Sequence, residues 1–235
     1  MRSACAPFTK SEESVPDAVL VSDFDGTMTA NDFYKLAVQR LLTPEDLAPW
    51  REYLAGKRTH FAALQEIFGS LRATEAQLLE LVRDMAPDPG LADAVARLRT
   101  AGWRVVVASA GCGWYIRRIL ASLGLGTQVE VHANPGELLP GGALRMTLPA
   151  ASPYTCLETG VDKAAIVRGH QAAGSTVAFA GDGFADLPAA LQVRPELRFA
   201  RADLAQALRE RGEGFQTFNR WSEVALALLS RGAAA

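Results

Sequence analysis

Cysteine and histidine are scarce in this 235-residue chain, which contains three of each. The cysteines, Cys5, Cys112 and Cys156, are odd in number and far apart, so no disulfide scaffold is expected. Neither residue type shows the paired spacing of a zinc site. No stretch approaches the roughly 18 to 20 successive apolar residues that span a bilayer. The N-terminal segment also lacks the apolar centre of a signal peptide, so we expect a cytoplasmic location.

The chain also has little excess of one charge sign over the other. The formal net charge is -2 and basic residues form no long run, so we expect neither nucleic acid nor a membrane as a partner. Hydrophobic residues make up 49% of the chain and charged residues only 21%, which predicts a large buried core. The expected partner is a small molecule, and the oligomeric state stays open between a monomer and a homodimer.

Short apolar runs alternate with helical patterns along the chain. Such runs are typical of strands buried on both faces of a parallel sheet. The helical patterns end at Gly102, Gly124 and Gly174, where glycine is a common terminator. The alternation predicts an α/β fold with a doubly wound, mostly parallel sheet and helices on both faces. The predicted strands are 18–21, 104–108, 176–180 and 197–200, and the predicted helices are 91–100, 114–123 and 162–173.

Two stretches break this alternation. Residues 33–85 are helical in pattern throughout, which predicts an all-helical insertion. Residues 128–133 and 143–148 each alternate around a glycine-containing connection, which predicts a small β-hairpin flap. The expected organisation is a flexible tail over 1–17, a core over 18–31 and 88–235 with the flap at about 127–150, and a helical unit over 32–87.

A pair of carboxylates directly follows the first predicted strand, in Asp23-Phe24-Asp25-Gly26-Thr27. Side chains two residues apart on an extended backbone share a side, so Asp23 and Asp25 should project together. Paired carboxylates there suit a hard cation and a nucleophile beside a general acid. The alternative is turn chemistry, in which Gly26 adopts positive φ and Asp25 caps the next helix.

Two later segments place polar groups after a strand or at a helix start. Ser109-Ala110-Gly111 should end a strand and open a helix, where a hydroxyl and backbone N–H groups can face a phosphoryl group. Small residues that ease packing are the alternative. Lys163 should lie in the first turn of a helix capped by Asp162, where a cation is disfavoured by roughly 0.3–1 kcal/mol unless an anion compensates. An exposed surface lysine is the alternative.

Two more acids follow the third strand, in Gly181-Asp182-Gly183-Phe184-Ala185-Asp186. Asp182 and Asp186 are four residues apart, so in a first helical turn they share a face and can complete a Mg²⁺ shell directly and through water. Helix capping is the alternative, above all for Asp186. All these segments should meet at the carboxyl edge of the sheet, where doubly wound folds bind ligands.

Taken in order, the segments resemble the signature of the haloacid dehalogenase (HAD) superfamily, whose phosphatases carry DxDGT, a Ser or Thr, a Lys and a GDxxxD-type acidic motif. The resemblance covers nearly the whole chain, and the helical insertion resembles the type-1 cap on a Rossmannoid core. It implies a Mg²⁺-dependent phosphomonoester hydrolase. The implied roles are Asp23 as nucleophile, Asp25 as acid/base, Ser109, Ala110, Gly111 and Lys163 as phosphate-binding residues, Asp23, Asp25 and Asp182 as Mg²⁺ ligands, and Thr27, Gly183 and Asp186 as their supports.

Within the superfamily the chain is most similar to the phosphoserine-phosphatase-like branch, especially to methionine-salvage phosphatases acting on 2-hydroxy-3-keto-5-methylthiopentenyl-1-phosphate. Asp32 falls where phosphoserine phosphatases have a substrate-binding Glu, which implies a substrate-binding role. The cap is apolar near Phe68, where those enzymes supply an arginine, so phosphoserine is disfavoured. Only Cys156 stands where the methionine-salvage enzymes often carry several cysteines, so phosphoserine, phosphoethanolamine and phosphocholine stay alternatives. The similarity rests on residues 23–27, 29–32, 68–71, 109–111 and 199–201.

The sequence leaves three alternative functions to be weighed. Cys112 and Arg118 have the C-x₅-R spacing of cysteine-based phosphatases, but the bulky residues between them argue against a phosphate cradle. A dehalogenase of the same superfamily does not need the acid that Asp25 supplies for an alcohol leaving group, so its presence favours phosphate esters. A catalytically silent relative that binds a phosphorylated ligand is the third alternative, and the filled catalytic positions disfavour it.

Overall fold

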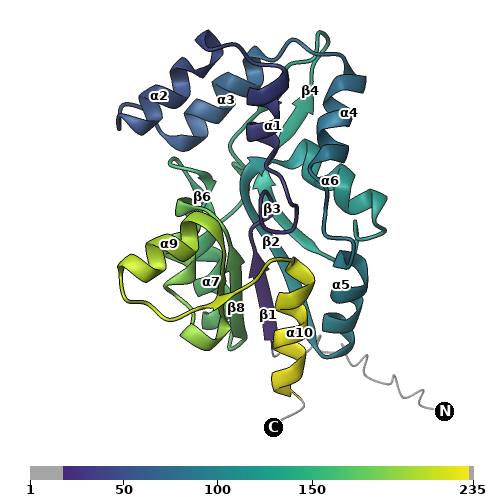
Figure 1. Cartoon of the computed structure of the whole chain (residues 1–235), viewed down its shortest axis with the longest axis vertical. Helices are drawn as coiled ribbons and strands as arrows, with labels where there is room; N and C mark the ends of the chain where they lie inside the picture. The colour runs from purple at the N-terminus through teal and green to yellow at the C-terminus, as the bar shows by residue number, and fades with distance from the viewer. Residues whose placement is uncertain (1–17, 233–235) are drawn as a thin grey trace, which may run out of the picture.

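A six-stranded parallel sheet forms the centre of the computed structural model, which describes residues 18–232. The strand order is β10-β9-β8-β1-β2-β3, so the first strand of the chain lies inside the sheet (Figure 1). The doubly wound α/β fold is confirmed, and the tail expected at 1–17 lies outside the described residues. The strands are β1 (Ala18–Ser22), β2 (Trp103–Cys112), β3 (Glu130–Asn134), β8 (Thr176–Gly181), β9 (Arg198–Ala200) and β10 (Gln216–Thr217).

Helices cover both faces of the sheet because successive strand side chains point to opposite sides. Leu20 and Val105 pack with α5, α6 and α10 in one core, whereas their neighbours Val19 and Val106 pack with α7, α8 and α9 in another. None of the helices in residues 18–232 has the length and apolar character of a membrane span. The helices are α5 (Leu91–Thr100), α6 (Gly113–Ser122), α7 (Lys163–Ala172), α8 (Leu187–Ala190), α9 (Ala202–Glu210) and α10 (Trp221–Gly232).

The predicted all-helical insertion is confirmed, and it stands over the carboxyl ends of the strands (Figure 1). Ile67 and Leu78 of this helical unit belong to the same hydrophobic core as Leu20 of β1. The two segments that join it to the sheet run side by side, since the Ala30 amide donates to the Ala86 carbonyl at 2.9 Å. Its elements are α1 (Phe33–Arg40), the 3₁₀ turn η1 (Glu45–Leu47), α2 (Ala48–Leu54), α3 (His60–Ser70) and α4 (Glu75–Asp84).

The predicted β-hairpin exists, but its first arm was assigned to the wrong residues. β4 (Gly136–Leu138) pairs antiparallel with β5 (Leu144–Met146), whereas residues 130–134 form β3 and pair in parallel with β2. A strand at the edge of a sheet is only partly covered, so its side chains alternate as those of a hairpin arm do. The hairpin docks on the helical unit, because the Gln65 side chain donates to the Met146 carbonyl at 2.8 Å. A second small hairpin joins β6 (Thr155–Cys156) to β7 (Gly160–Val161).

Candidate active site

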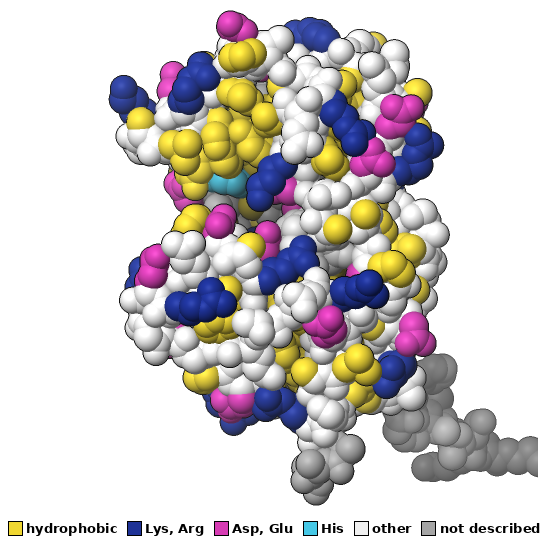
Figure 2. Space-filling view, in the orientation of Figure 1, with side chains coloured by type: hydrophobic (Ala, Val, Ile, Leu, Met, Phe, Trp, Pro, Cys, Tyr) yellow, Lys and Arg dark blue, Asp and Glu magenta, His cyan; other side chains and the backbone are white. Residues whose placement is uncertain are grey.

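The predicted polar segments meet at one cavity of about 360 Å³ between the sheet and the helical unit. Ser22, the last residue of β1, lies level with Val107 of β2 and Ala180 of β8, so the residues that follow these strands emerge together. Figure 2 shows the surface hollowed there. The predicted site residues lining this cavity are Asp23, Asp25, Asp32, Ser109, Ala110, Gly111, Lys163, Asp182, Gly183 and Asp186.

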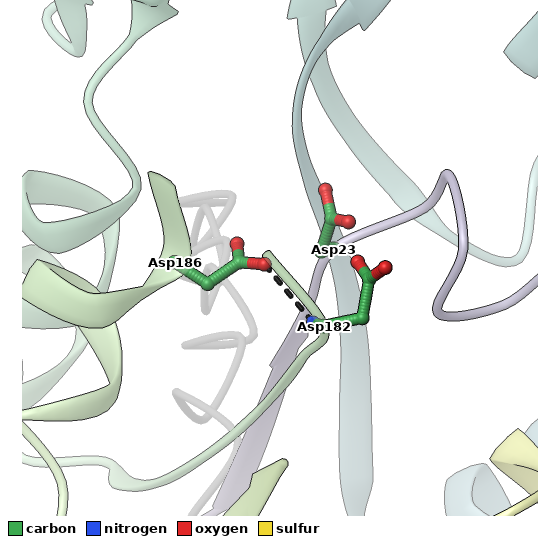
Figure 3. A group of neighbouring side chains, drawn as sticks. All are labelled: Asp23, Asp182 and Asp186. Atoms are coloured by element: carbon green, nitrogen blue, oxygen red, sulfur yellow. Dashed lines mark hydrogen bonds between the residues drawn. The ribbon is translucent and has the colours of Figure 1, made fainter. Parts of the chain in front are cut away.

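Three carboxylates converge at the floor of the cavity. One oxygen from each of Asp23, Asp182 and Asp186 lies within 4.8 Å of the others, and Figure 3 shows Asp186 pointing toward the neighbouring side chains of Asp23 and Asp182. Thr27 donates its hydroxyl to Asp182 at 3.1 Å and makes a longer contact of 3.3 Å with Asp23. Gly26 has the positive φ of the turn alternative, +70°, and a Cβ there would overlap the Asp182 carboxylate. Turn geometry and carboxylate clustering therefore occur together.

Lys163 is buried among these acids. Its ammonium donates to Asp23 and to Asp186, in both cases at 2.6 Å, and its side chain is only 5% exposed. Asp162 caps α7 by accepting from Ala165 at 2.8 Å, as the sequence predicted. Burial lowers the pKa of Lys163, but the carboxylates of Asp186 and Asp23 outweigh it and raise that pKa above its ordinary value. The surface-lysine alternative is wrong.

The acidic floor has the chemistry of a divalent-cation site. Burial and the nearby Asp23 raise the pKa of Asp182 to about 8, and burial raises that of Asp186 to about 6. Asp186 also accepts the amides of Asp182 and Gly183 at 3.1 and 3.0 Å, so it orders the loop that carries Asp182. Asp23 and Asp186 are buried and share the Lys163 ammonium, and the partly buried Asp182 lies beside them. Hard oxygen ligands with excess negative charge fit an ion such as Mg²⁺.

Asp25 faces away from this cluster, toward the helical unit. Its Oδ1 accepts the Phe33 amide at 3.1 Å, and its Oδ2 accepts the Tyr115 hydroxyl at 2.9 Å. Burial, followed by the charges of Asp32 and Asp23, raises the pKa of Asp25 well above its ordinary value. A carboxyl group that keeps its proton near neutral pH can act as a general acid. Asp25 accepts the first amide of α1, as the capping alternative expected, but the N-cap residue of that helix is Asp32.

The segment Ser109–Gly111 lies at an irregular strand end and not at the helix start that the sequence predicted. β2 continues to Cys112 with a register shift after Ala108, and α6 begins at Gly113. Within the segment, the Gly111 amide donates to the Ser109 hydroxyl at 3.0 Å. A helix N-terminus therefore does not face the cavity directly at this segment, and the Ser109 hydroxyl is the polar group that lines it.

An unpredicted residue, Asn134, supports this segment. Its side-chain amide donates to the Ala110 carbonyl at 2.8 Å and to the Thr159 carbonyl at 3.0 Å. Asn134 ends β3, and Thr159 lies in the turn before β7, so one buried amide ties three strands' ends together. In the sequence, Asn134 begins the run Asn134-Pro135-Gly136, which predicted only a turn. That pattern does not indicate a contact between Asn134 and Ala110.

The wall of the cavity opposite the acids is apolar and comes from the helical unit. The Trp50 ring lies 4.5 Å from that of Tyr34 and 5.0 Å from that of Tyr53, measured between centroids. Burial lowers the pKa of His60 on the same wall to about 4, so its ring is neutral at physiological pH. Figure 2 shows hydrophobic side chains gathered above the hollow. Asp32, at the edge of this wall, caps α1 by accepting the Lys35 amide at 3.1 Å.

Two further residues brace Asp23 and were not predicted. The Trp221 indole donates to the Ser22 hydroxyl at 2.9 Å, and that hydroxyl donates to the Asp23 carbonyl at 2.7 Å. All three residues are buried. A serine ending an apolar strand was the available signal, but its partner lies 199 positions away.

The cysteine-based alternative has no support from the geometry. Cys112 is buried, and burial raises the pKa of its thiol to about 11, so the thiolate is scarce near neutral pH. The Arg118 guanidinium lies 4.1 Å from the Trp114 ring centroid and pairs with Glu75 at 3.8 Å. The other described cysteine, Cys156, contacts the Thr159 hydroxyl at 3.1 Å.

The sequence profile of the haloacid dehalogenase-like hydrolases matches residues 20–191, and the chain belongs to that family. A 2-hydroxy-3-keto-5-methylthiopentenyl-1-phosphate phosphatase from Brevibacillus brevis is 28% identical over 205 residues, which cover 86% of this chain and 91% of the relative.

Solved structures share the fold. A probable phosphoserine phosphatase from Vibrio cholerae has a TM-score of 0.65 at 20% identity, and the match covers 94% of this chain and 68% of that one. A phosphoserine phosphatase solved as a phospho-aspartyl intermediate analogue has a TM-score of 0.63 at 17% identity, covering 90% and 98%.

Proposed function

We propose that this protein is a Mg²⁺-dependent phosphomonoester hydrolase that acts on a small cytoplasmic metabolite through a phosphorylated Asp23. The observation that carries the proposal is the pairing of a buried carboxylate, Asp23, held by Lys163, with a second carboxyl, Asp25, whose raised pKa keeps its proton. A nucleophile and an acid with these separate environments are what ester cleavage requires. The oligomeric state, monomer or homodimer, is not part of the proposal.

In the first step, a carboxylate oxygen of Asp23 attacks phosphorus, and the bond from phosphorus to the leaving oxygen breaks. Asp25 gives its proton to that oxygen, so the product leaves as an alcohol. Lys163 and the Ser109 hydroxyl bind the phosphoryl oxygens. Mg²⁺ held by Asp23, Asp182 and the Asp25 carbonyl would supply positive charge that offsets repulsion between carboxylate and phosphate.

In the second step, water attacks the phosphorus of the aspartyl-phosphate and the bond to the Asp23 oxygen breaks. The Asp25 carboxylate takes the proton from that water, which returns both residues to their starting states. We propose that residues 32–87 act as a cap that shields these steps from bulk water, on a core formed by 18–31 and 88–235. Thr27, Gly183 and Asp186 hold the acids in place in this scheme.

For the substrate, we propose a phosphate ester whose leaving group ends in an apolar chain, and 2-hydroxy-3-keto-5-methylthiopentenyl-1-phosphate as the particular compound. The wall formed by Trp50, Tyr53 and His60 supports this, because aromatic rings and a neutral imidazole favour an apolar chain over a zwitterion. Within residues 18–232, the cavity lining contains no arginine, and its two lysines are Lys35 and Lys163. The 28% identical relative carries this substrate in its name.

The test is phosphate release from a panel of that compound, phosphoserine, phosphoethanolamine and phosphocholine, with Mg²⁺ and with EDTA. We expect Mg²⁺-dependent release that is fastest for the apolar ester, and an acid-stable phosphorylated protein that Asp23→Asn abolishes. Asp93→Asn on the exposed face of α5 is the matched control and should retain activity. Turnover by Asp23→Asn at the unsubstituted rate would refute the mechanism, and no release from any compound would favour the silent relative.

A further inference from the structure

The carboxyl group of Asp25 is held from two different parts of the molecule. Phe33, which donates to Oδ1 at 3.1 Å, is the first residue of α1 in the helical unit. Tyr115, which donates to Oδ2 at 2.9 Å, lies on α6 against the sheet. A movement of the helical unit would carry the first donor away and leave the second in place.

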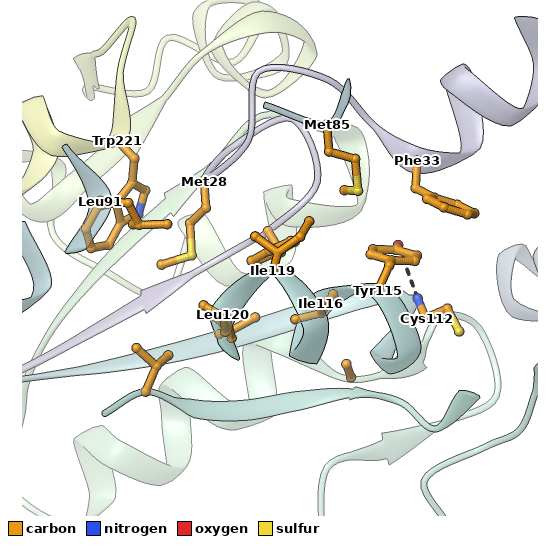
Figure 4. Packing of buried hydrophobic residues seen from close by; sticks show 14 of the residues in the cluster. Met28, Phe33, Met85, Leu91, Cys112, Tyr115, Ile116, Ile119, Leu120 and Trp221 are labelled. Carbon is orange, nitrogen blue, oxygen red and sulfur yellow. Dashed lines mark hydrogen bonds between the residues drawn. The ribbon is translucent and has the colours of Figure 1, made fainter. Parts of the chain in front are cut away.

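The direction of the Tyr115 hydrogen bond follows from its second partner. The Cys112 amide lies 3.2 Å from the Tyr115 hydroxyl oxygen, and an amide N–H can only donate (Figure 4). The hydroxyl oxygen therefore accepts from Cys112, which leaves its own hydrogen for Asp25. The Phe33 ring stacks on the Tyr115 ring, with centroids 4.5 Å apart and planes 12° from parallel, and the side chain is 1% exposed. The phenol has no room to rotate toward water.

Gly111 provides the space that the hydroxyl occupies. A Cβ at this position would overlap the Tyr115 hydroxyl and lie 2.8 Å from the Asp25 Oδ2 atom. The third residue of the Ser109–Gly111 segment therefore has a role besides phosphate binding, because its missing side chain lets the phenol reach the carboxyl group.

We propose that Tyr115 is a positioning residue that aims the Asp25 carboxyl group at the leaving oxygen from the core side of the cavity. A carboxyl oxygen has a second lone-pair direction, so Oδ2 can accept from Tyr115 and still face the substrate. The proposal rests on the proposed function, in which Asp25 exchanges the proton. Tyr115 itself does not take part in bond making or breaking.

The kinetic test compares two leaving groups in Tyr115→Phe. Loss of a well-aimed acid should lower kcat/KM, which reports the first step alone, for an alkyl phosphate by about 10-fold or more, a part of the about 10²–10⁴ that general acids contribute. The kcat/KM for p-nitrophenyl phosphate should change far less, because nitrophenolate leaves without a proton. Tyr154→Phe, which removes a hydroxyl outside the cavity lining, is the control and should leave both rates unchanged. Equal falls for both substrates, or no fall for either, would overturn the proposal.

Asp25→Asn separates failure of this proposal from failure of the function. If Asp25→Asn lowers kcat/KM selectively for the alkyl phosphate and Tyr115→Phe does not, only the role of Tyr115 is wrong. If Asp25→Asn lowers kcat/KM equally for both substrates, the assigned acid is wrong. A crystal structure of Tyr115→Phe gives a readout besides activity: we expect the Asp25 carboxyl group to rotate, and an unchanged orientation would count against the proposal.

The glycine supplies a double-mutant cycle. Gly111→Ala should lower alkyl-phosphate turnover by displacing the Tyr115 hydroxyl, and its Cβ would also approach the Asp25 Oδ2 atom in either background. The losses from Gly111→Ala and Tyr115→Phe should therefore be less than additive. Fully additive losses would mean that the two residues act independently, which contradicts the proposed contact.

Discussion

At the scale of single residues, the cavity is a place where the fold has buried charge. Lys163 pairs with both Asp23 and Asp186, and all three side chains are nearly inaccessible. Removing one partner of a buried ion pair leaves a charge without compensation, which costs about 3–5 kcal/mol. The ammonium is therefore a structural requirement as well as a phosphate ligand in the proposed reaction.

Lys163→Met should lower the free energy of unfolding by about 3 kcal/mol, because two buried carboxylates lose their cation. Urea denaturation in EDTA measures this loss, and added Mg²⁺ should recover part of it. Lys57→Met, at an exposed position, is the control and should change stability by less than about 0.5 kcal/mol. A Lys163→Met protein as stable as the control would show that Asp23 and Asp186 are not both ionised in the folded protein.

The stability of the metal-free protein should fall as pH rises from about 4 to 8. Over that window the unfolded chain has lost the Asp182 proton, whereas the folded protein, with a pKa of about 8, still holds it. The native state then binds more protons, and its stability decreases with pH. Urea midpoints at pH 5 to 8 in EDTA measure the trend. Mg²⁺ should flatten it, because a bound cation stabilises the ionised carboxylates.

Asp182→Asn is the comparison that isolates this residue. Its stability should decline less steeply with pH than that of the unsubstituted protein, since the amide has no proton to lose. Identical slopes in EDTA would contradict the raised pKa.

Local sequence patterns located the acids but not Tyr115 and Trp221, which support them from distant helices. Asp23 and Asp182 follow apolar strands directly, so their meeting could be predicted from the rule that parallel strands end at one edge. Tyr115 and Asp25 are 90 positions apart, and Trp221 and Ser22 are 199 apart. Such contacts depend on how helices sit on the sheet, and no spacing in the sequence encodes that.

At the scale of elements, the hairpin β4–β5 connects the sheet to the helical unit. Its loop residue Gly142 has a φ of +88°, and a Cβ there would overlap the Ala73 carbonyl. Leu144 and Met146 of β5 are buried in the core that the helical unit shares with the sheet. The hairpin therefore packs against the helical unit and supports it, and it is not a free flap.

Gly142→Ala should destabilise the protein more than Gly141→Ala. Both glycines have positive φ, +88° and +90°, so both substitutions carry the same backbone penalty of about 1 kcal/mol. Only position 142 adds a clash, since nothing lies within 4 Å of a Cβ at 141. Thermal unfolding should show the additional drop in Tm. Equal Tm values would mean that the loop does not press on Ala73.

The error in the hairpin prediction has a physical cause. Residues 128–133 alternate apolar and polar side chains, and this pattern shows that one face is covered but not which strand lies beside it. β3 pairs with β2 through the shared sheet edge, while a nearby proline, Pro135, separates it from β4. The central strands and the helices could be predicted more directly from the sequence. A continuous apolar run bounded by glycine indicates a strand buried on both faces, which leaves fewer possible neighbours in the sheet.

At the scale of the whole molecule, the last helix reaches back to the first strand. Trp221 at the start of α10 is completely buried, and its indole is the donor to Ser22, the residue before Asp23 (Figure 4 shows Trp221 among the core residues). α10 also packs on α5, which continues from the helical unit. One buried hydrogen bond thus links the two ends of the described chain.

Trp221→Phe should lower the free energy of unfolding by about 1–3 kcal/mol, because the Ser22 hydroxyl loses a buried donor. A double-mutant cycle with Ser22→Ala, followed by urea denaturation, measures the coupling. We expect the paired losses to be less than additive. Additivity would show that the two side chains do not interact.

The bond between Trp221 and Ser22 also bears on the order in which the parts of the site are made. Synthesis adds Asp23 before α10, the helix that holds its backbone through Ser22. A chain that stops before α10 holds every acid of the cavity and still lacks the indole that supports Asp23 through Ser22. The order of the chain therefore places this support of Asp23 after all of the acids beside it.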